Sequence, residues 1–348
     1  MSEFSLIKKY FTRPTRHTNL GIGDDAALIT VASGMQLAIS SDTLVAGTHF
    51  LADCAPYDIG WKALAVNVSD MAAMGVQAKW ATLAIALPSI DEAWLAEFSR
   101  GFFACADTFN IDLIGGDTTR GPLNISVTIM GEVPTGEALR RDGAQVGDDI
   151  WVSGTLGDAA LALAILQNRY KIDTNWLEDE LEKWLPSLHR PQARAVLGLA
   201  LRSIATSCID ISDGLLADLG HILKASNCGA QIHLEQLPVS LYNLNHLQEP
   251  AIQQCVLTGG DDYELCFTAP KNTRKLIEEI GKDQHLLLTR IGSTTWLLGC
   301  RLVIKITLLL FQYKVLIILA NLLYSVILSI AKNPVLMAKQ LNSSRCSE

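Results

Sequence analysis

The sequence predicts an α/β protein built from two domains. Its 348 residues exceed the usual size of one domain. Apolar, strand-like runs alternate with helix-like patterns in both halves, and Gly147 and Asp148 mark a boundary between them. We therefore expect a first α/β domain over residues 1–140, a second over 147–294 and an atypical hydrophobic tail over 295–348.

The first half begins its regular pattern with a strand-like run from Met35, "MQLAISSD". The next stretch, "PYDIGWKALAVNVSDMAAMG", predicts a helix that begins at Pro56 and ends before Gly75. A second helix is expected in "SIDEAWLAEF", where Ser89 and Glu92 have the spacing of a capping box. Two strands follow, in "IDLIGGDTT" and "NISVTIMGEV".

The second half starts with a strand over Ile150–Ser153 and a helical pattern, "GDAALALAILQN". A polar, Trp-bearing segment leads to a helix from Pro191, a strand "SCIDIS" and a helix "DGLLADLGHILKAS" that ends near Gly229. The stretch "CVLTGGDDYELCF" is expected to form a strand, a turn and a strand. This alternation of strands and helices predicts the second α/β domain.

Charge and cysteine content exclude several classes of protein. The formal net charge is −8 and no run of Lys or Arg occurs, so a nucleic acid is not expected as a partner. The eight cysteines are scattered without a C-x-x-C motif, which is typical of reduced thiols and argues against a structural zinc. The N-terminal residues lack the apolar core of a secretory signal. We expect a cytoplasmic protein.

Aspartates recur where apolar segments end, with Gly, Ser or Thr beside them. These residues are Asp24, Asp25, Asp42, Asp70, Asp117, Asp210, Asp213, Asp261 and Asp262. Any one of them is typical of a turn or a helix cap. If several converge, each pair of carboxylates at 4 Å repels by roughly 4 kcal/mol at an effective dielectric near 20. Cations would relieve this repulsion, and oxygen ligands without His or Cys favour Mg²⁺ or Ca²⁺.

A dinucleotide-binding fingerprint is the alternative interpretation of the first acidic stretch, "GIGDDAAL". Gly21, Gly23 and Ala26 match G-x-G-x-x-A, and Asp42 follows about 20 residues on. No convincing strand precedes Gly21, and no helix of sufficient length separates Gly23 from Asp42. Two carboxylates would also face the pyrophosphate. The context therefore favours a metal site over this fingerprint.

Several acidic motifs together resemble the thiamine-monophosphate kinase family. The motifs are, in order, "GIGDDAAL", "ISSDTLVAGTHF", "KALAVNVSDMAAMG", "LIGGDTTRGP", "IDISDGLLADLGHI" and "GGDDYELCF". The resemblance spans roughly residues 3 to 293 and extends to the superfamily of aminoimidazole-ribonucleotide synthetase and selenophosphate synthetase. It implies two α/β domains, a homodimer formed through strands of the first domain, and transfer of the ATP γ-phosphoryl group to thiamine monophosphate. ATP would be the co-substrate, several Mg²⁺ ions the cofactors, and no side chain a covalent nucleophile.

The resemblance also implies site residues, taken over motif by motif. The metal ligands would be Asp25, Ser40, Ser41, Asp42, Asp70, Asp117, Asp210 and Asp213. Gly116, Asp117, Arg141 and Ser212 would bind ATP, and His49 and Asp261 would bind thiamine monophosphate. Asp261 stands where the family usually has glutamate. Without the resemblance, His49 is typical of a hydrogen-bonded loop histidine and Arg141 of a solvated cation.

The resemblance ends after "TRIGS", and the aromatic residue that the family has near its C-terminus is not identifiable here. Within the tail, Val315 to Ala331 carries no charge. We favour an altered reading frame or a gene-end rearrangement over a buried or oligomer-forming helix, and membrane association through the tail is possible but not favoured. Two functional alternatives stay open: a relative that phosphorylates another small acceptor, and a tail-altered protein that binds ATP and metal without turnover.

Overall fold

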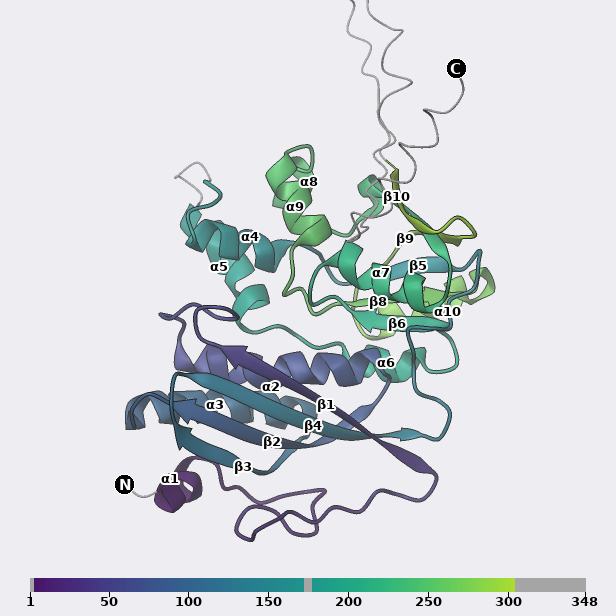
Figure 1. The fold of residues 1–348 in the computed structure, drawn as a ribbon. Helices are drawn as coiled ribbons and strands as arrows, with labels where there is room; N and C mark the ends of the chain where they lie inside the picture. Colours follow the sequence, from purple (N-terminus) through teal and green to yellow (C-terminus); the bar gives the residue numbers. More distant parts are fainter. Residues whose placement is uncertain (1–2, 172–176, 304–348) are drawn as a thin grey trace, which may run out of the picture.

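Two sheets, each packed against helices, form the computed structural model, which describes residues 3–171 and 177–303 (Figure 1). The first domain has a four-stranded sheet and the second a six-stranded sheet. The predicted fold class of two α/β domains is confirmed. The linker between the last strand of the first domain and the first strand of the second contains Gly147 and Asp148, as expected.

The sheet of the first domain has the strand order β1-β4-β2-β3. Only β2 and β3 run parallel, and the other neighbours are antiparallel. Helices α2 and α3 cover one face of this sheet (Figure 1). The elements are α1 (Glu3–Tyr10), β1 (Met35–Val45), α2 (Pro56–Ala73), β2 (Gln77–Leu87), α3 (Glu92–Phe109), β3 (Asp112–Arg120) and β4 (Asn124–Pro134).

Successive side chains of β1 point to opposite faces of the sheet, so neighbouring residues of this strand face different surroundings. Ser40 and Asp42 face α2 and are half-buried. Leu37 and Ile39 lie on the opposite face, where the Ile39 side chain is 61% exposed. The face covered by α2 therefore bears these two polar side chains of β1, and the other face bears the two apolar ones.

Helices α2 and α3 approach each other closely because glycines lie at their crossing. A Cβ atom at Gly60 would stand 2.1 Å from the carbonyl oxygen of Phe98, and one at Gly101 would stand 1.9 Å from that of Tyr57. No larger residue fits at either position without moving a helix. This contact fixes α2 against α3 and so fixes the side chains that α2 directs away from α3.

The second domain has the strand order β10-β7-β9-β5-β8-β6. Only β10 and β7 run parallel. Its strands are β5 (Asp149–Ser153), β6 (Ser207–Asp210), β7 (Gly229–His233), β8 (Leu265–Ala269), β9 (Leu288–Thr295) and β10 (Gly299–Val303). Its α-helices are α4 (Asp158–Leu166), α5 (Leu177–His189), α6 (Ala195–Leu201), α7 (Leu215–Ala225), α8 (Leu241–Asn245), α9 (Pro250–Thr258) and α10 (Arg274–Asp283), and its short 3-10 helices are η1 (Leu234–Gln236) and η2 (Lys271–Thr273).

Helix α2 lies between the two domains (Figure 1). One side packs on the first sheet, and the other contacts α6 and β6 of the second domain. A Cβ atom at Gly198 would stand 2.0 Å from the carbonyl oxygen of Ala72, so α6 and α2 touch backbone to backbone. Ala72 and Ala73 belong to a hydrophobic cluster that also contains Phe267 of β8. The two domains therefore share part of their core.

Two local expectations are wrong. Helix α3 is capped by Asp91, whose carboxylate accepts hydrogen bonds from the N–H groups of Ala93 and Trp94, and Ser89 lies outside the helix. The Asp91 side chain sits one residue before the helix and reaches two free amides, so it replaces the expected capping box. The first arm of "CVLTGGDDYELCF" is not a strand but the end of α9, because Pro250 starts a helix that runs to Thr258.

Other boundaries differ by a few residues. The helix expected from Pro191 begins at Ala195, and the Trp-bearing segment before it contains α5. Strand β10 pairs with β7, so the second sheet includes residues that were assigned to the tail. In residues 3–171 and 177–303, no helix has the length and apolar character needed to cross a membrane. The uncharged run over 315–331 lies outside the described residues.

Candidate functional site

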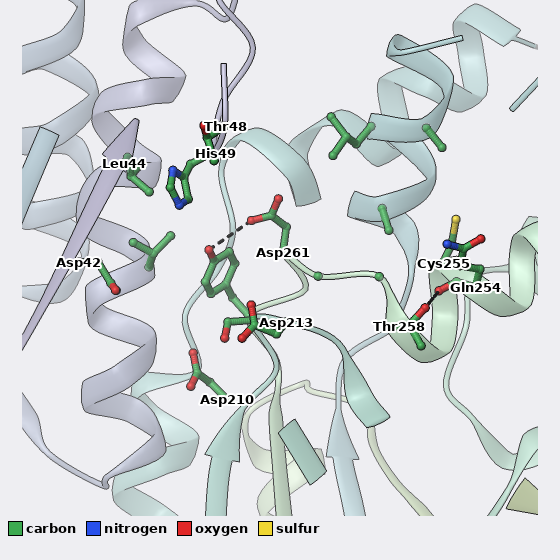
Figure 2. Close-up of a pocket in the computed structure, with 18 of the residues that line it drawn as sticks. Asp42, Leu44, Thr48, His49, Asp210, Asp213, Gln254, Cys255, Thr258 and Asp261 are labelled. Carbon is green, nitrogen blue, oxygen red and sulfur yellow. Dashed lines mark hydrogen bonds between the residues drawn. The ribbon is translucent and has the colours of Figure 1, made fainter. Parts of the chain in front are cut away.

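A cavity of about 760 Å³ lies between the two domains (Figure 2). The first domain contributes the end of β1, the loop after it and α2. The second domain contributes the loops after β6 and α9, together with parts of α4 and α9. Strand ends, loops and helices thus supply polar groups from both domains to one space.

Five carboxylates line this cavity, and four of them were predicted as metal ligands: Asp42, Asp70, Asp210 and Asp213. Asp42 ends the polar part of β1, Asp70 lies in the last turn of α2, and Asp210 is the last residue of β6. Asp213 follows in the loop after β6. The fold therefore brings these four aspartates to one cavity.

Neighbouring hydroxyl groups orient two of these carboxylates, and the Asn67 side chain holds the backbone of a third residue, Asp42. The Ser40 hydroxyl donates a hydrogen bond of 2.5 Å to Asp70 Oδ2, and the Ser69 hydroxyl donates one of 2.8 Å to Asp210 Oδ2. The backbone N–H of Asp42 donates to Asn67 Oδ1 at 3.2 Å. Helix α2 thus holds the acidic side of the cavity through consecutive turns.

Burial disfavours the ionised form of these acids. Desolvation, together with the charge of Asp70, raises the pKa of Asp42. Desolvation also raises the pKa of Asp70, against the opposing effects of its bond from Ser40 and of the Arg141 guanidinium. Desolvation and the Asp70 charge raise the pKa of Asp210 to about 7. A divalent cation at this position would relieve the desolvation and the mutual repulsion.

The donor set fits a hard cation. It consists of carboxylate and hydroxyl oxygens without Cys ligands, which suits Mg²⁺. In the described part of the chain, no group of three or more His, Cys, Asp or Glu residues is close enough to form a coordination shell. The chemistry of the ligands therefore supports a magnesium site, while the side chains are not drawn together around one point.

The substrate residues predicted from the motifs lie at the same cavity. His49 and Asp261 both line it, and Figure 2 shows them on separate elements near the same end. His49 Nδ1 accepts a hydrogen bond of 3.0 Å from the N–H of Val45, so the neutral ring carries its proton on Nε2. Ser212, predicted to bind ATP, also lines the cavity.

Other predicted residues lie elsewhere. Asp25, Gly116 and Asp117 line a second cavity of about 710 Å³, between α1, the loop around residues 22–27, β2 and β3. The Ser41 side chain lies on the face of β1 away from Asp42, where its hydroxyl contacts Thr128 Oγ1 at 3.0 Å. Within one chain, the predicted metal ligands therefore fall into two groups.

Asp218 was not among the predicted residues, although it shapes the loop after β6. Its Oδ2 accepts hydrogen bonds from the N–H groups of Ser212, Asp213 and Gly214, at 3.0, 3.0 and 3.1 Å. These bonds fix the backbone of the loop, in which Ser212 and Asp213 line the cavity. The signal in the sequence was present, because Asp218 lies in the first turn of the helix that follows "ISDG".

The apolar wall of the cavity was also missed. It is formed by side chains of α4 and α9 and of the segment that directly follows α4. The wall residues are Ala160, Leu163, Ala164, Tyr170, Ala251 and Cys255. Because "CVLT" was assigned to a strand, the sequence could not place α9 against α4.

The comparisons with known proteins first define a class. Residues 23–133 match the family "AIR synthase related protein, N-terminal domain", and residues 145–295 match "AIR synthase related protein, C-terminal domain". The two domains are thus those of an AIR synthase related protein. Among curated proteins, the thiamine-monophosphate kinase of Salmonella typhimurium is 50% identical over 296 residues, which cover 84% of this chain and 90% of that protein.

More distant relatives and solved structures agree. The thiamine-monophosphate kinase of Bacillus subtilis is 34% identical over 299 residues, 84% of this chain and 91% of that protein. The crystal structure of thiamine-monophosphate kinase from Stenotrophomonas maltophilia has a TM-score of 0.79 and 48% identity, covering 87% of this chain and 96% of that one. The structure of AaThiL complexed with AMPPCP and TMP has a TM-score of 0.68 and 31% identity, covering 81% and 87%. The chain belongs to the thiamine-monophosphate kinase family.

Proposed function

We propose that this chain is an Mg²⁺-dependent thiamine-monophosphate kinase that transfers the γ-phosphoryl group of ATP directly to thiamine monophosphate, giving thiamine diphosphate and ADP. The observation that carries the proposal is the interdomain cavity, where Asp42, Asp70, Asp210 and Asp213 face the same space as His49. Half of the residues aligned with the Salmonella typhimurium enzyme are identical, and AaThiL binds AMPPCP and TMP on the same fold.

The proposed reaction needs no nucleophilic side chain. The acceptor is already a phosphate, whose second pKa of about 6 leaves it mostly ionised near neutral pH. The difficulty is to bring two anions together in line, and catalysis then consists of positioning and charge neutralisation. A carboxylate-rich cavity can do this only with bound cations.

Asp42, Asp70, Asp210 and Asp213 are the residues that would hold Mg²⁺ in this cavity. Bound Mg²⁺ supplies charge neutralisation between the phosphates of donor and acceptor. The Ser40 hydroxyl, which already donates to Asp70, orients that carboxylate. Ser212 and Arg141 would contact ATP. Ser212 lines the cavity, and the charge of the Arg141 guanidinium opposes the effect of burial on the pKa of Asp70, which supports a position of Arg141 near the acidic side of the cavity.

A homodimer is part of the proposal. Strand β1 is at an edge of its sheet, and Met35, Leu37 and Ile39 are exposed on the face away from α2. A second copy of the same surface would cover these side chains. We expect twice the chain mass by light scattering for the wild type and one chain mass for Ile39→Lys, whose charge would be buried at this surface. A monomeric wild type would exclude the homodimer.

The proposed location is the cytoplasm, where thiols stay reduced. All cysteines in the described part of the chain are free, and five of them are buried in the two domains. This is the usage expected in a reducing compartment.

The decisive experiment is formation of thiamine diphosphate from ATP, Mg²⁺ and thiamine monophosphate, measured by thiochrome fluorescence after chromatography. Asp70→Asn should lower the rate by about 100-fold or more, because it removes a carboxylate that would hold the Mg²⁺ needed to neutralise the phosphates. Asp107→Asn is the matched control, since Asp107 is exposed on α3 and pairs with Arg13 and Arg16. A wild type that forms no product, or an Asp70→Asn variant with normal activity, would refute the proposal.

A further inference from the structure

Lys62 is a buried cation that none of the predicted site residues explains. It lies in α2, and only 3% of its surface is exposed. Lysine is almost never fully buried unless its ammonium group is paired. The buried ammonium group beside the interdomain cavity therefore requires a polar or charged partner.

The ammonium group contacts both residues predicted to bind the acceptor. Lys62 Nζ is 3.0 Å from Asp261 Oδ1, and it donates a hydrogen bond of 3.4 Å to the carbonyl oxygen of His49. His49 belongs to the first domain and Asp261 to the second. One lysine thus ties together the two sides of the cavity at the end where these residues lie (Figure 2).

Asp261 is held from several directions. Its backbone has a φ of 69°, in the left-handed region, and its N–H donates to the carbonyl oxygen of Ser212 at 2.9 Å. The Tyr263 hydroxyl donates to the same Oδ1 that Lys62 contacts, at 3.2 Å. Within the described ranges, Oδ2 has no such partner. The carboxylate is therefore fixed through one oxygen, and the other is available to a ligand.

Lys62 is not itself part of the cavity wall, whereas His49 and Asp261 are. The Asp261 side chain is 28% exposed and the Lys62 side chain 4%. Any effect of Lys62 on a bound ligand must then pass through its two partners. This distinguishes it from a phosphate-binding lysine, which would present its ammonium group to the ligand.

We infer that Lys62 is a positioning residue for the acceptor site, an inference that rests on the proposed function. It holds Asp261 so that Oδ2 faces the cationic thiazolium ring of the acceptor, and it holds the His49 loop at a fixed distance from Asp261. The shorter Asp261, where the family usually has glutamate, makes this fixed placement more important.

The test compares Lys62→Met, Asp261→Asn and the double variant. Lys62→Met keeps the length of the side chain without its charge, and the double variant avoids leaving an unpaired carboxylate, so it is the variant expected to fold if the single one does not. We expect Lys62→Met to raise KM for thiamine monophosphate about tenfold and to change KM for ATP less than twofold. If Lys62 acts through Asp261, the double variant should be no worse than Asp261→Asn alone.

Arg274→Met is the matched control, because it removes a cation from another buried carboxylate. Arg274 Nη2 donates to Asp149 Oδ1 at 2.7 Å in a part of the second domain that does not line the cavity. It should lower the melting temperature without changing either KM. For Lys62→Met, an unchanged KM for thiamine monophosphate, or equal rises in both KM values, would overturn the inference. A wild type without thiamine diphosphate formation would instead refute the proposed function.

Discussion

At the scale of the residue, the site is governed by the cost of burying negative charge. Asp42, Asp70 and Asp210 all have raised pKa values because desolvation disfavours their ionised forms. A cation bound in the cavity would lower these pKa values again and favour the ionised carboxylates. Protein stability and metal binding are therefore linked through these side chains.

Asp210 provides a measurable form of this link. Its pKa is raised to about 7, so the metal-free protein loses stability as pH rises from the ordinary value near 4 through about 7. Asp210→Asn carries no charge and should escape this loss. We expect the metal-free variant to melt several degrees above the metal-free wild type at about pH 8, with the difference shrinking toward about pH 5.

Thermal melts in the presence of a chelator measure this difference. Addition of Mg²⁺ should raise the melting temperature of the wild type more than that of Asp210→Asn, because the cation binds the charge that the variant lacks. Equal melting temperatures across this pH range would show that Asp210 is not buried as a costly charge.

At the scale of the element, helix α3 shows what local chemistry decides. The sequence indicated the helix but assigned its cap to Ser89, whereas Asp91 accepts the first free N–H groups. We expect Asp91→Ala to lower the free energy of unfolding by about 1 kcal/mol and Ser89→Ala to change it by less than about 0.5 kcal/mol. Urea unfolding measures both. The reverse order would restore the capping box as the true cap.

Strand β10 makes a second element testable. It pairs with β7 over Gly299–Val303, so a chain ending after Val303 keeps the six-stranded sheet. A chain ending after Ser293 loses β10 and the end of β9. We expect the first truncation to keep its activity and melting temperature, and the second to melt lower. Equal melting curves for the two truncations would show that β10 does not stabilise the sheet.

The limits of sequence reasoning follow from these elements. Strand β1, helix α2 and the acidic ends of β1 and β6 could be predicted. Their signals are the hydrophobic pattern of each segment and the polar residues at its end, and both can be read from neighbouring residues. The position of Asp117 relative to Asp42 could not be predicted, because it depends on strand order and register in the sheet. The role of Lys62 was hidden for a similar reason: in the sequence it is one cation in an apolar helix, and its partner Asp261 belongs to the other domain.

At the scale of the whole molecule, the division of predicted ligands between two cavities needs an explanation. Asp42 pairs with Val127, which pairs with Leu83, which pairs with Gly116 beside Asp117. This row crosses three strand spacings, roughly 14 Å at about 4.8 Å each. That is too far for one metal ion. A homodimer that brings β3 of one copy to β1 of the other would join the two groups.

Mixing two inactive variants tests this arrangement. Asp70→Asn and Asp117→Asn each lack one group, and in a mixed dimer one of the two shared sites would be intact. Co-refolded variants should then recover up to about a quarter of wild-type activity per chain, while each variant alone stays inactive. Absence of recovery, with mixed dimers demonstrated by mass, would place both groups of ligands in a site within one chain.

Helix α2 has a consequence for how ligands reach the cavity. One side of α2 packs on the first sheet and the other on α6 and β6. A hinge motion that separated the two domains would therefore disrupt the hydrophobic core that they share. Entry and release must then depend on the loops at the rim, such as those that carry His49 and Asp261. For the same reason, either domain expressed alone would expose a strip of hydrophobic surface and tend to precipitate.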